Sequence, residues 1–147
     1  MAFNPRAAPR SREEFLKWFR IQNESDEAHS HDDPKNIDSP LKEWLLDFMK
    51  EFPAMNGPYA VGDDMIDDPH VTDYSMAKDV VCYCFAWSLA DEAYSKMKIS
   101  TAMHAVGFFN VSADPGEIVF PDLEVEKKCR IKKRLRFLLR RVRSPKH

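Results

Sequence analysis

The chain has 147 residues, which is enough for one compact domain with a substantial core. Hydrophobic residues make up 44% and charged residues 31%, an ordinary composition for a globular protein. No apolar run approaches the roughly 20 residues that span a bilayer, and the start of the chain lacks the apolar segment of a secretory signal. The three cysteines, an odd number, argue against a disulfide scaffold and favour a reducing cytoplasm.

The net charge of −2 conceals a segregation of charge along the chain. Residues 1–126 contain 24 acidic and 11 basic residues, a formal charge of −13. Residues 127–147 contain the other 11 basic residues and no acidic residue. A protein surface whose charges are mostly of one sign attracts partners of the opposite charge. This layout therefore predicts that the protein selects its partners by their charge.

The first part of the chain predicts a helix followed by an acidic loop. Residues 1–10 are short and contain two prolines, and we expect at most a fragment of an edge strand. Ser11 and Glu14 have the spacing of a capping box, and aromatic residues then fall on one side of a helix over residues 12–22. Residues 23–37 are polar and acidic and predict a loop.

A second helix is predicted from Ser39, a good N-cap residue, with Pro40 at the first helical position. Its apolar stripe has spacings of three and four and ends before Pro53. The stripe consists of Leu41, Trp44, Leu45, Phe48, Met49 and Phe52. Residues 54–71 contain two prolines, two glycines and four aspartates and predict a long loop, a feature that is often functional in a compact domain.

The clearest pattern predicts a strand, a helix and a hairpin over residues 72–121. Residues 80–86 form a short apolar run that favours a strand, and residues 74–77 extend it or pair beside it. Residues 88–105 have helical spacing, with Gly107 as a plausible stop.

The hairpin consists of two predicted strands, residues 106–112 and 117–120, joined by a tight turn. In this turn Pro115 presets φ and Gly116 accepts a positive φ. Together the elements predict an α+β fold, a small and mainly antiparallel sheet packed by about three helices.

The domain is expected over residues 1–122, and residues 123–147 predict a basic amphipathic helix that extends it. Apolar residues in this extension are spaced four, three and four apart, among lysines and arginines. They are Ile131, Leu135, Leu138 and Val142.

No motif in the sequence specifies a reaction. Cys82 and Cys84 alternate on a predicted strand and point to one face, where a structural role is favoured over metal or redox chemistry. His104 could act as a general base, but no nucleophile motif accompanies it in the sequence. The sequence also contains neither a phosphate-binding loop nor a dinucleotide fingerprint. We therefore expect no enzymatic activity and no cofactor, with Trp18, Trp44 and Trp87 in the core.

Histidines and aspartates cluster in the two acidic loops. They could ligate a metal, but an EF-hand beginning at Asp63 is absent because its sixth and twelfth positions are Asp68 and Tyr74. A solvated acidic surface is the favoured interpretation. The residues concerned are His29, His31, Asp32, Asp33, Asp67, Asp68, His70 and Asp73.

Two binding surfaces are candidates. The first is the acidic loops, whose alternative role is solubility alone; its candidate contacts are Asp32, Asp33, Tyr59, Asp63, Asp64, Asp67 and Asp68. The second is the basic helix, which could bind nucleic acid, lie on an anionic membrane or fold back on the acidic body. Its candidate contacts are Lys132, Lys133, Arg134, Arg136, Arg140 and Arg141.

Several segments, among them FLKWF, FPAMNGP and the DEAY of residues 91–94, resemble a group of small, uncharacterised bacterial proteins over roughly residues 8–121. The resemblance implies a single α+β domain, similar in size and acidity to toxin-neutralising immunity proteins, and carries over no catalytic residue. The chain departs from the group in its short leading strand, MAFNP, and in its basic tail.

The function that we expect is therefore that of a non-enzymatic, acidic, cytoplasmic protein. It docks on and neutralises a positively charged partner, such as a bacterial toxin or nuclease domain. The alternative is a nucleic-acid-binding protein that uses the basic C-terminal helix.

Overall fold

The computed structural model describes residues 1–24, 31–122, 124, 127 and 131. In this part of the chain a five-stranded sheet has the spatial order β2-β3-β1-β4-β5, and every neighbouring pair is antiparallel. The strands are β1 (Ala2–Phe3), β2 (Asp73–Met76), β3 (Val80–Cys84), β4 (Gly107–Asn110) and β5 (Glu117–Val119). The helices are α1 (Arg12–Glu24), α2 (Leu41–Phe48) and α3 (Ala90–Met103). The predicted α+β fold is confirmed.

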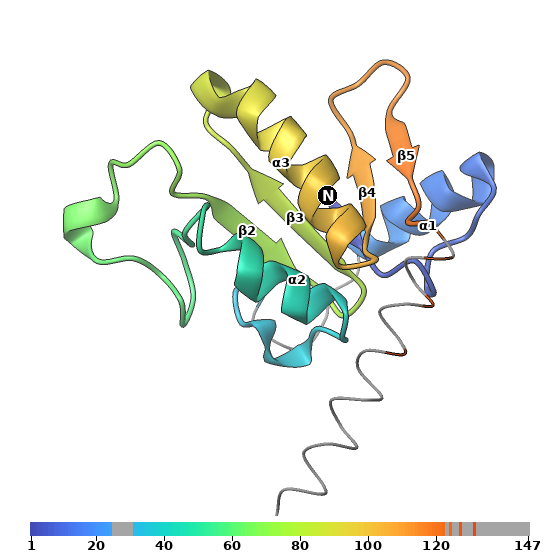
Figure 1. Cartoon of the computed structure of the whole chain (residues 1–147), viewed down its shortest axis with the longest axis horizontal. Coiled ribbons are helices and arrows are strands. Elements are labelled where there is room, and N and C mark those ends of the chain that lie inside the picture. The colour runs from blue at the N-terminus through green and yellow to red at the C-terminus, as the bar shows by residue number, and fades with distance from the viewer. Residues whose placement is uncertain (25–30, 123, 125–126, 128–130, 132–147) are drawn as a thin grey trace, which may run out of the picture.

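The helices cover both faces of the sheet (Figure 1). On one face α2 and α3 pack over a cluster that includes Trp44, Met97 and Phe108. On the other face α1 packs through Phe15 onto a second cluster that contains Phe3. The sheet is thus the central layer of three.

The start of the chain supplies the central strand. Ala2 pairs with Val81 on one side and with Phe108 on the other, and Ala2 and Phe3 are both 0% exposed. The prediction of an edge strand is therefore wrong. A strand of two residues is too short to show a periodicity that would have marked it as buried on both faces.

Two predictions about glycines are also wrong. The positive φ after α3 belongs to Ala105 (54°), while Gly107 lies in β4 beneath the ring of Phe3. A Cβ on Gly107 would lie 2.2 Å from ring atoms of Phe3, so the close approach of that ring explains the glycine. Gly116 has no positive φ either, and instead lies against the ring of Phe109.

The helix starts agree in part with the sequence. The Glu14 N–H donates to the Ser11 hydroxyl at 3.4 Å, as the capping-box spacing predicts, and the Ser11 hydroxyl donates to the Glu14 carboxylate at 2.8 Å. Ser39, by contrast, does not cap α2, because Pro40 is the N-cap residue and the Ser39 hydroxyl donates to Glu43.

The segment after β3 leaves the core earlier than expected. Trp44 is fully buried and Trp18 is partly buried, but Trp87 is 93% exposed in the 3₁₀ turn Trp87–Leu89. The prediction that all three tryptophans are core residues is wrong for Trp87. Cys82 is partly buried, whereas Cys84 is exposed at the end of β3.

Candidate functional site

A long loop, residues 53–72, leaves the body between α2 and β2 and projects to the left of the sheet (Figure 1). Ala54 closes its base by bridging to both Ala60 and Thr72. The Met55 N–H donates to the Thr72 carbonyl at 2.9 Å, and the Val61 N–H donates to the Ala54 carbonyl at 2.9 Å. The loop therefore has a hydrogen-bonded base, and its outer part contains the 3₁₀ turn Asp63–Met65.

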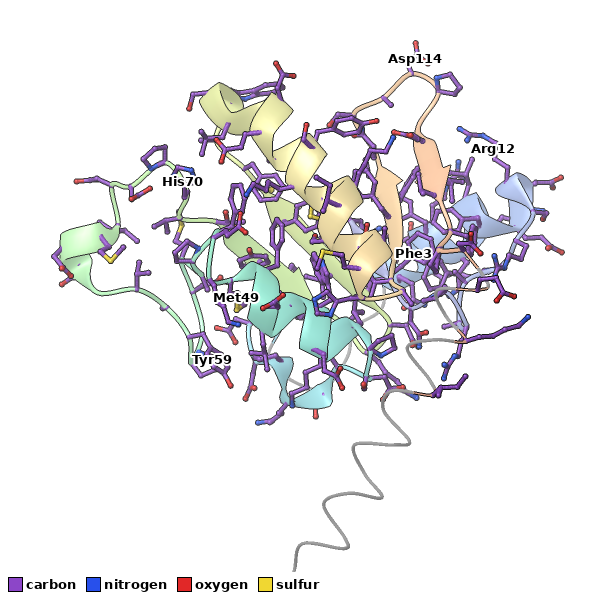
Figure 2. All side chains as sticks on the ribbon, in the orientation of Figure 1. Phe3, Arg12, Met49, Tyr59, His70 and Asp114 are labelled. Atoms are coloured by element: carbon purple, nitrogen blue, oxygen red, sulfur yellow. The ribbon has the colours of Figure 1, made fainter. Side chains whose placement is uncertain are left out.

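Large apolar side chains are exposed along this loop. Tyr59 is 53% exposed and points away from the sheet (Figure 2). Met55, Met65 and Ile66 are exposed as well. Exposed aromatic and methionine side chains are enriched in protein interfaces, so the loop offers anchors as well as charge.

Four of the predicted aspartates lie on the same loop and are exposed: Asp63, Asp64, Asp67 and Asp68. Asp68 accepts a hydrogen bond from the His70 N–H at 2.8 Å and lies 3.1 Å from His70 Nδ1, and both contacts lower the pKa of its carboxyl group. His70 also lies 3.6 Å from Glu92 of α3 and against the Phe52 ring. The histidine thus ties one end of the loop to the body.

The other predicted acidic segment lies against the first part of the loop. Gly57, at φ 77°, approaches the backbone of Asp32 so closely that a Cβ would lie 2.2 Å from the Asp32 carbonyl oxygen. Asp33 caps the 3₁₀ turn Pro34–Asn36 by accepting from the Lys35 N–H at 2.9 Å, which lowers the pKa of Asp33. The structure therefore brings this segment beside the residues around Tyr59, and Asp33 has a structural role there.

The remaining candidates fall elsewhere. His29 and the basic residues from Lys132 to Arg141 lie outside the described residues, so their roles stay predictions. Within the described part, no group of three or more His, Cys, Asp or Glu side chains is arranged to hold a metal. His104 lies 3.1 Å from Asp47 and links the end of α3 to α2. Of the helices that were described, none has the length and apolarity needed to cross a membrane.

Sequence reasoning missed a cavity of about 650 Å³ that lies between the ends of β3 and β4 and the start of α3. Its lining is largely aromatic and apolar, and it includes the exposed Trp87. Its lining includes Met1, Tyr83, Trp87, Ala90, Tyr94 and Phe108. No sequence signal marks this place, because it depends on where β1 lies in the sheet.

No protein-family model, no curated protein and no solved structure matches this chain. The resemblance to small bacterial proteins is untested by these comparisons and stays a prediction. The class that the geometry defines is an α+β domain with a projecting loop of acidic and apolar side chains.

Proposed function

We propose that this chain is a non-enzymatic binding protein whose projecting loop, residues 53–72, docks on a positively charged protein surface. One observation carries the proposal: exposed Tyr59, Met65 and Ile66 alternate along the loop with four exposed aspartates. Solubility alone would explain the aspartates but not the exposed apolar anchors beside them.

The two kinds of side chain contribute differently to binding. The aspartates raise the association rate toward a cationic surface, an effect that salt weakens. The apolar side chains provide contact area that is desolvated in the complex, and so they slow dissociation. A loop with a hydrogen-bonded base loses less conformational entropy on binding than an unconstrained loop of equal length.

The partner that fits this chemistry is a toxin or nuclease domain with a basic active-site surface. Such a surface is cationic because it binds phosphates, and an acidic protein inhibits it by covering it. The proposal of an immunity-type function rests on this complementarity and on the analogy with small acidic immunity proteins.

The test is capture of a partner from an extract of the source cells with three forms of the full chain. These are the wild type, a loop variant with Asp63, Asp64, Asp67 and Tyr59 replaced by Asn, Asn, Asn and Ala, and a control variant, Asp114→Asn. Asp114 is exposed at the tip of the β4–β5 hairpin, far from the loop (Figure 2). We expect one basic protein that the wild type and the control retain and the loop variant loses, with association slowed by salt.

Equal retention by all three forms contradicts the proposal. The retained material could instead be nucleic acid whose binding is abolished when neutral residues replace Lys132, Lys133 and Arg134. That result would support the alternative function, nucleic-acid binding through the basic C-terminal segment. The observation that favours this alternative is the absence of acidic residues from residues 127–147.

A further inference from the structure

One histidine lies between two acidic side chains that belong to different parts of the molecule. Nδ1 of His70 lies 3.1 Å from Asp68 of the same loop, and Nε2 lies 3.6 Å from Glu92 of α3. The ring also packs against Phe52, which follows α2, at a centroid distance of 5.5 Å. Figure 2 shows His70 on the branch of the projecting loop that returns to the sheet. This residue therefore joins the loop to the start of α3.

The charged groups around His70 come from three elements. The loop contributes Asp68, α3 contributes Glu92 and Lys96, and the segment after α2 contributes Glu51. Lys96 forms an ion pair with Glu51, and its pKa is raised by that contact and by the charge of Glu92. The His70 ring thus has a carboxylate beside each of its nitrogens, and the lysine near Glu92 is shared with a third carboxylate.

The two ring nitrogens can donate to both carboxylates only when the imidazole is protonated. A neutral ring has one N–H group and one lone pair. If Nδ1 donates to Asp68, the lone pair of Nε2 faces the Glu92 carboxylate, and the two repel each other. An imidazolium donates from both nitrogens and carries a charge that both carboxylates attract. Because histidine side chains ordinarily change charge between about pH 5 and 8, this link between loop and helix is sensitive to pH.

We propose that His70 is a pH-dependent latch, which holds the returning branch of the projecting loop against α3 when its ring is protonated. Asp68 stays ionised at pH 5.5, because hydrogen bonds from His70 lower the pKa of its carboxyl group. The latch itself needs no partner. Only its effect on docking rests on the proposed function: a loop that is already held to the body loses less conformational entropy when it binds, so a lower pH favours docking.

The test is amide hydrogen exchange in the full chain at pH 5.5 and at pH 8. The probes are the N–H groups of Asp68 and Val71, which donate to the carbonyls of Met65 and Asp68 in this branch of the loop. The wild type is compared with Glu92→Gln. Dividing the exchange rate of the variant by that of the wild type at the same pH removes the direct effect of pH on exchange.

We expect the ratio of the two rates to depend on pH. At pH 5.5 the variant should exchange about fivefold faster, since it lacks one carboxylate of the latch; the effect is modest because His70 and Glu92 are 37% and 47% exposed. At pH 8 the ratio should be one or less, because the introduced amide can donate to the lone pair of Nε2.

Two controls show whether the effect belongs to the latch. Asp91→Asn removes the same charge from the same turn of α3, but on the side that lines the cavity, and its ratio should stay near one at both pH values. In a chain that carries His70→Gln, the further change Glu92→Gln should alter exchange equally at both pH values.

A ratio for Glu92→Gln that is the same at pH 5.5 and pH 8 overturns the proposal, as does an equal effect of Asp91→Asn. The exchange experiment contains no partner, so it is independent of the capture experiment. Failure to capture a basic protein would overturn the proposed function and leave the latch intact, whereas a ratio that does not depend on pH would overturn the latch alone.

Discussion

The closest packing between a glycine and a side chain occurs at Gly107, beneath Phe3. The Phe3 ring is itself held by edge contacts with Phe15, Trp18 and Phe120, at centroid distances of 5.0, 6.1 and 5.1 Å. A ring that is fixed on several sides cannot move away from an added atom, so this position tolerates only hydrogen.

We therefore expect Gly107→Ala to lower the free energy of unfolding by about 3 kcal/mol, the cost of overpacking a rigid site. Chemical denaturation measures it. Gly62→Ala is the control: its added Cβ would meet only the exposed and flexible Asp64 carboxylate, and we expect a change within about 0.5 kcal/mol. Equal effects of the two variants would contradict this explanation.

Two tyrosines differ in how their hydroxyl groups are satisfied. The Tyr74 hydroxyl is buried and donates to the Phe52 carbonyl at 2.8 Å. The Tyr83 hydroxyl is also buried, and among the described residues it has no hydrogen-bond partner. Burial raises the pKa of both side chains, so both stay protonated at neutral pH.

Replacing the two tyrosines by phenylalanine should consequently change the free energy of unfolding in opposite directions. Tyr83→Phe removes an unsatisfied buried hydroxyl and should stabilise the fold by about 1 kcal/mol, whereas Tyr74→Phe orphans a carbonyl and should destabilise it by about 1–2 kcal/mol. Thermal and urea unfolding of both variants measure this. A loss of stability in Tyr83→Phe would mean that its hydroxyl has a partner in solution.

At the scale of elements, the projecting loop is separable from the core. Hydrogen bonds among Ala54, Met55 and Thr72 close its base, Asn56 bonds to the backbone of Tyr74 in β2, and residues 62–69 are exposed. A surface loop that buries little contributes to stability mainly through its closure entropy, which depends on length and not on sequence.

Replacement of residues 63–67 by an equally long Gly/Ser segment should thus leave the free energy of unfolding within about 1 kcal/mol of the wild type. The same replacement should abolish partner binding. Denaturation and capture experiments on one preparation separate the two effects. A large loss of stability would show that the segment has a structural role instead.

The elements that could be predicted from sequence are those with many periodic residues. Helix α2 and strand β3 were identified from their apolar patterns, and the acidic loop from its prolines and glycines. The position of β1 could not be predicted because a strand of two residues shows no periodicity. The exposure of Trp87 could not be predicted because the apolar sequence continues past the end of β3. The candidate site could be predicted as far as its aspartates and Tyr59, but the exposure of Met65 and Ile66 depends on tertiary packing.

At the scale of the whole molecule, a chain with a free amino group at Met1 links its stability to pH from the centre of the sheet. The pKa of the Met1 amino group falls from 8.0 to about 5 on folding, because burial disfavours its charged form. The folded state therefore prefers the uncharged amine. This contribution to stability is complete above pH 8 and is lost progressively as the pH falls from 8 to 5.

For a chain with a free amino group at Met1, we expect the free energy of unfolding to decrease over this interval by at most about 4 kcal/mol. Urea midpoints measured across the interval test the slope. The chain acetylated at Met1 is the control and should lack this slope. Asp33, Asp47, Asp68 and Glu117, whose pKa values are lowered, lose their contributions only below the interval.

The pairing of Ala2 with Val81 and Phe108 has a consequence for biosynthesis. The innermost strand pairs with β4, which the ribosome makes more than a hundred residues later. Until β4 has been made, the nascent chain exposes the apolar residues that this strand later covers. We therefore expect the sheet to close late in folding, with its most non-local contacts setting the rate.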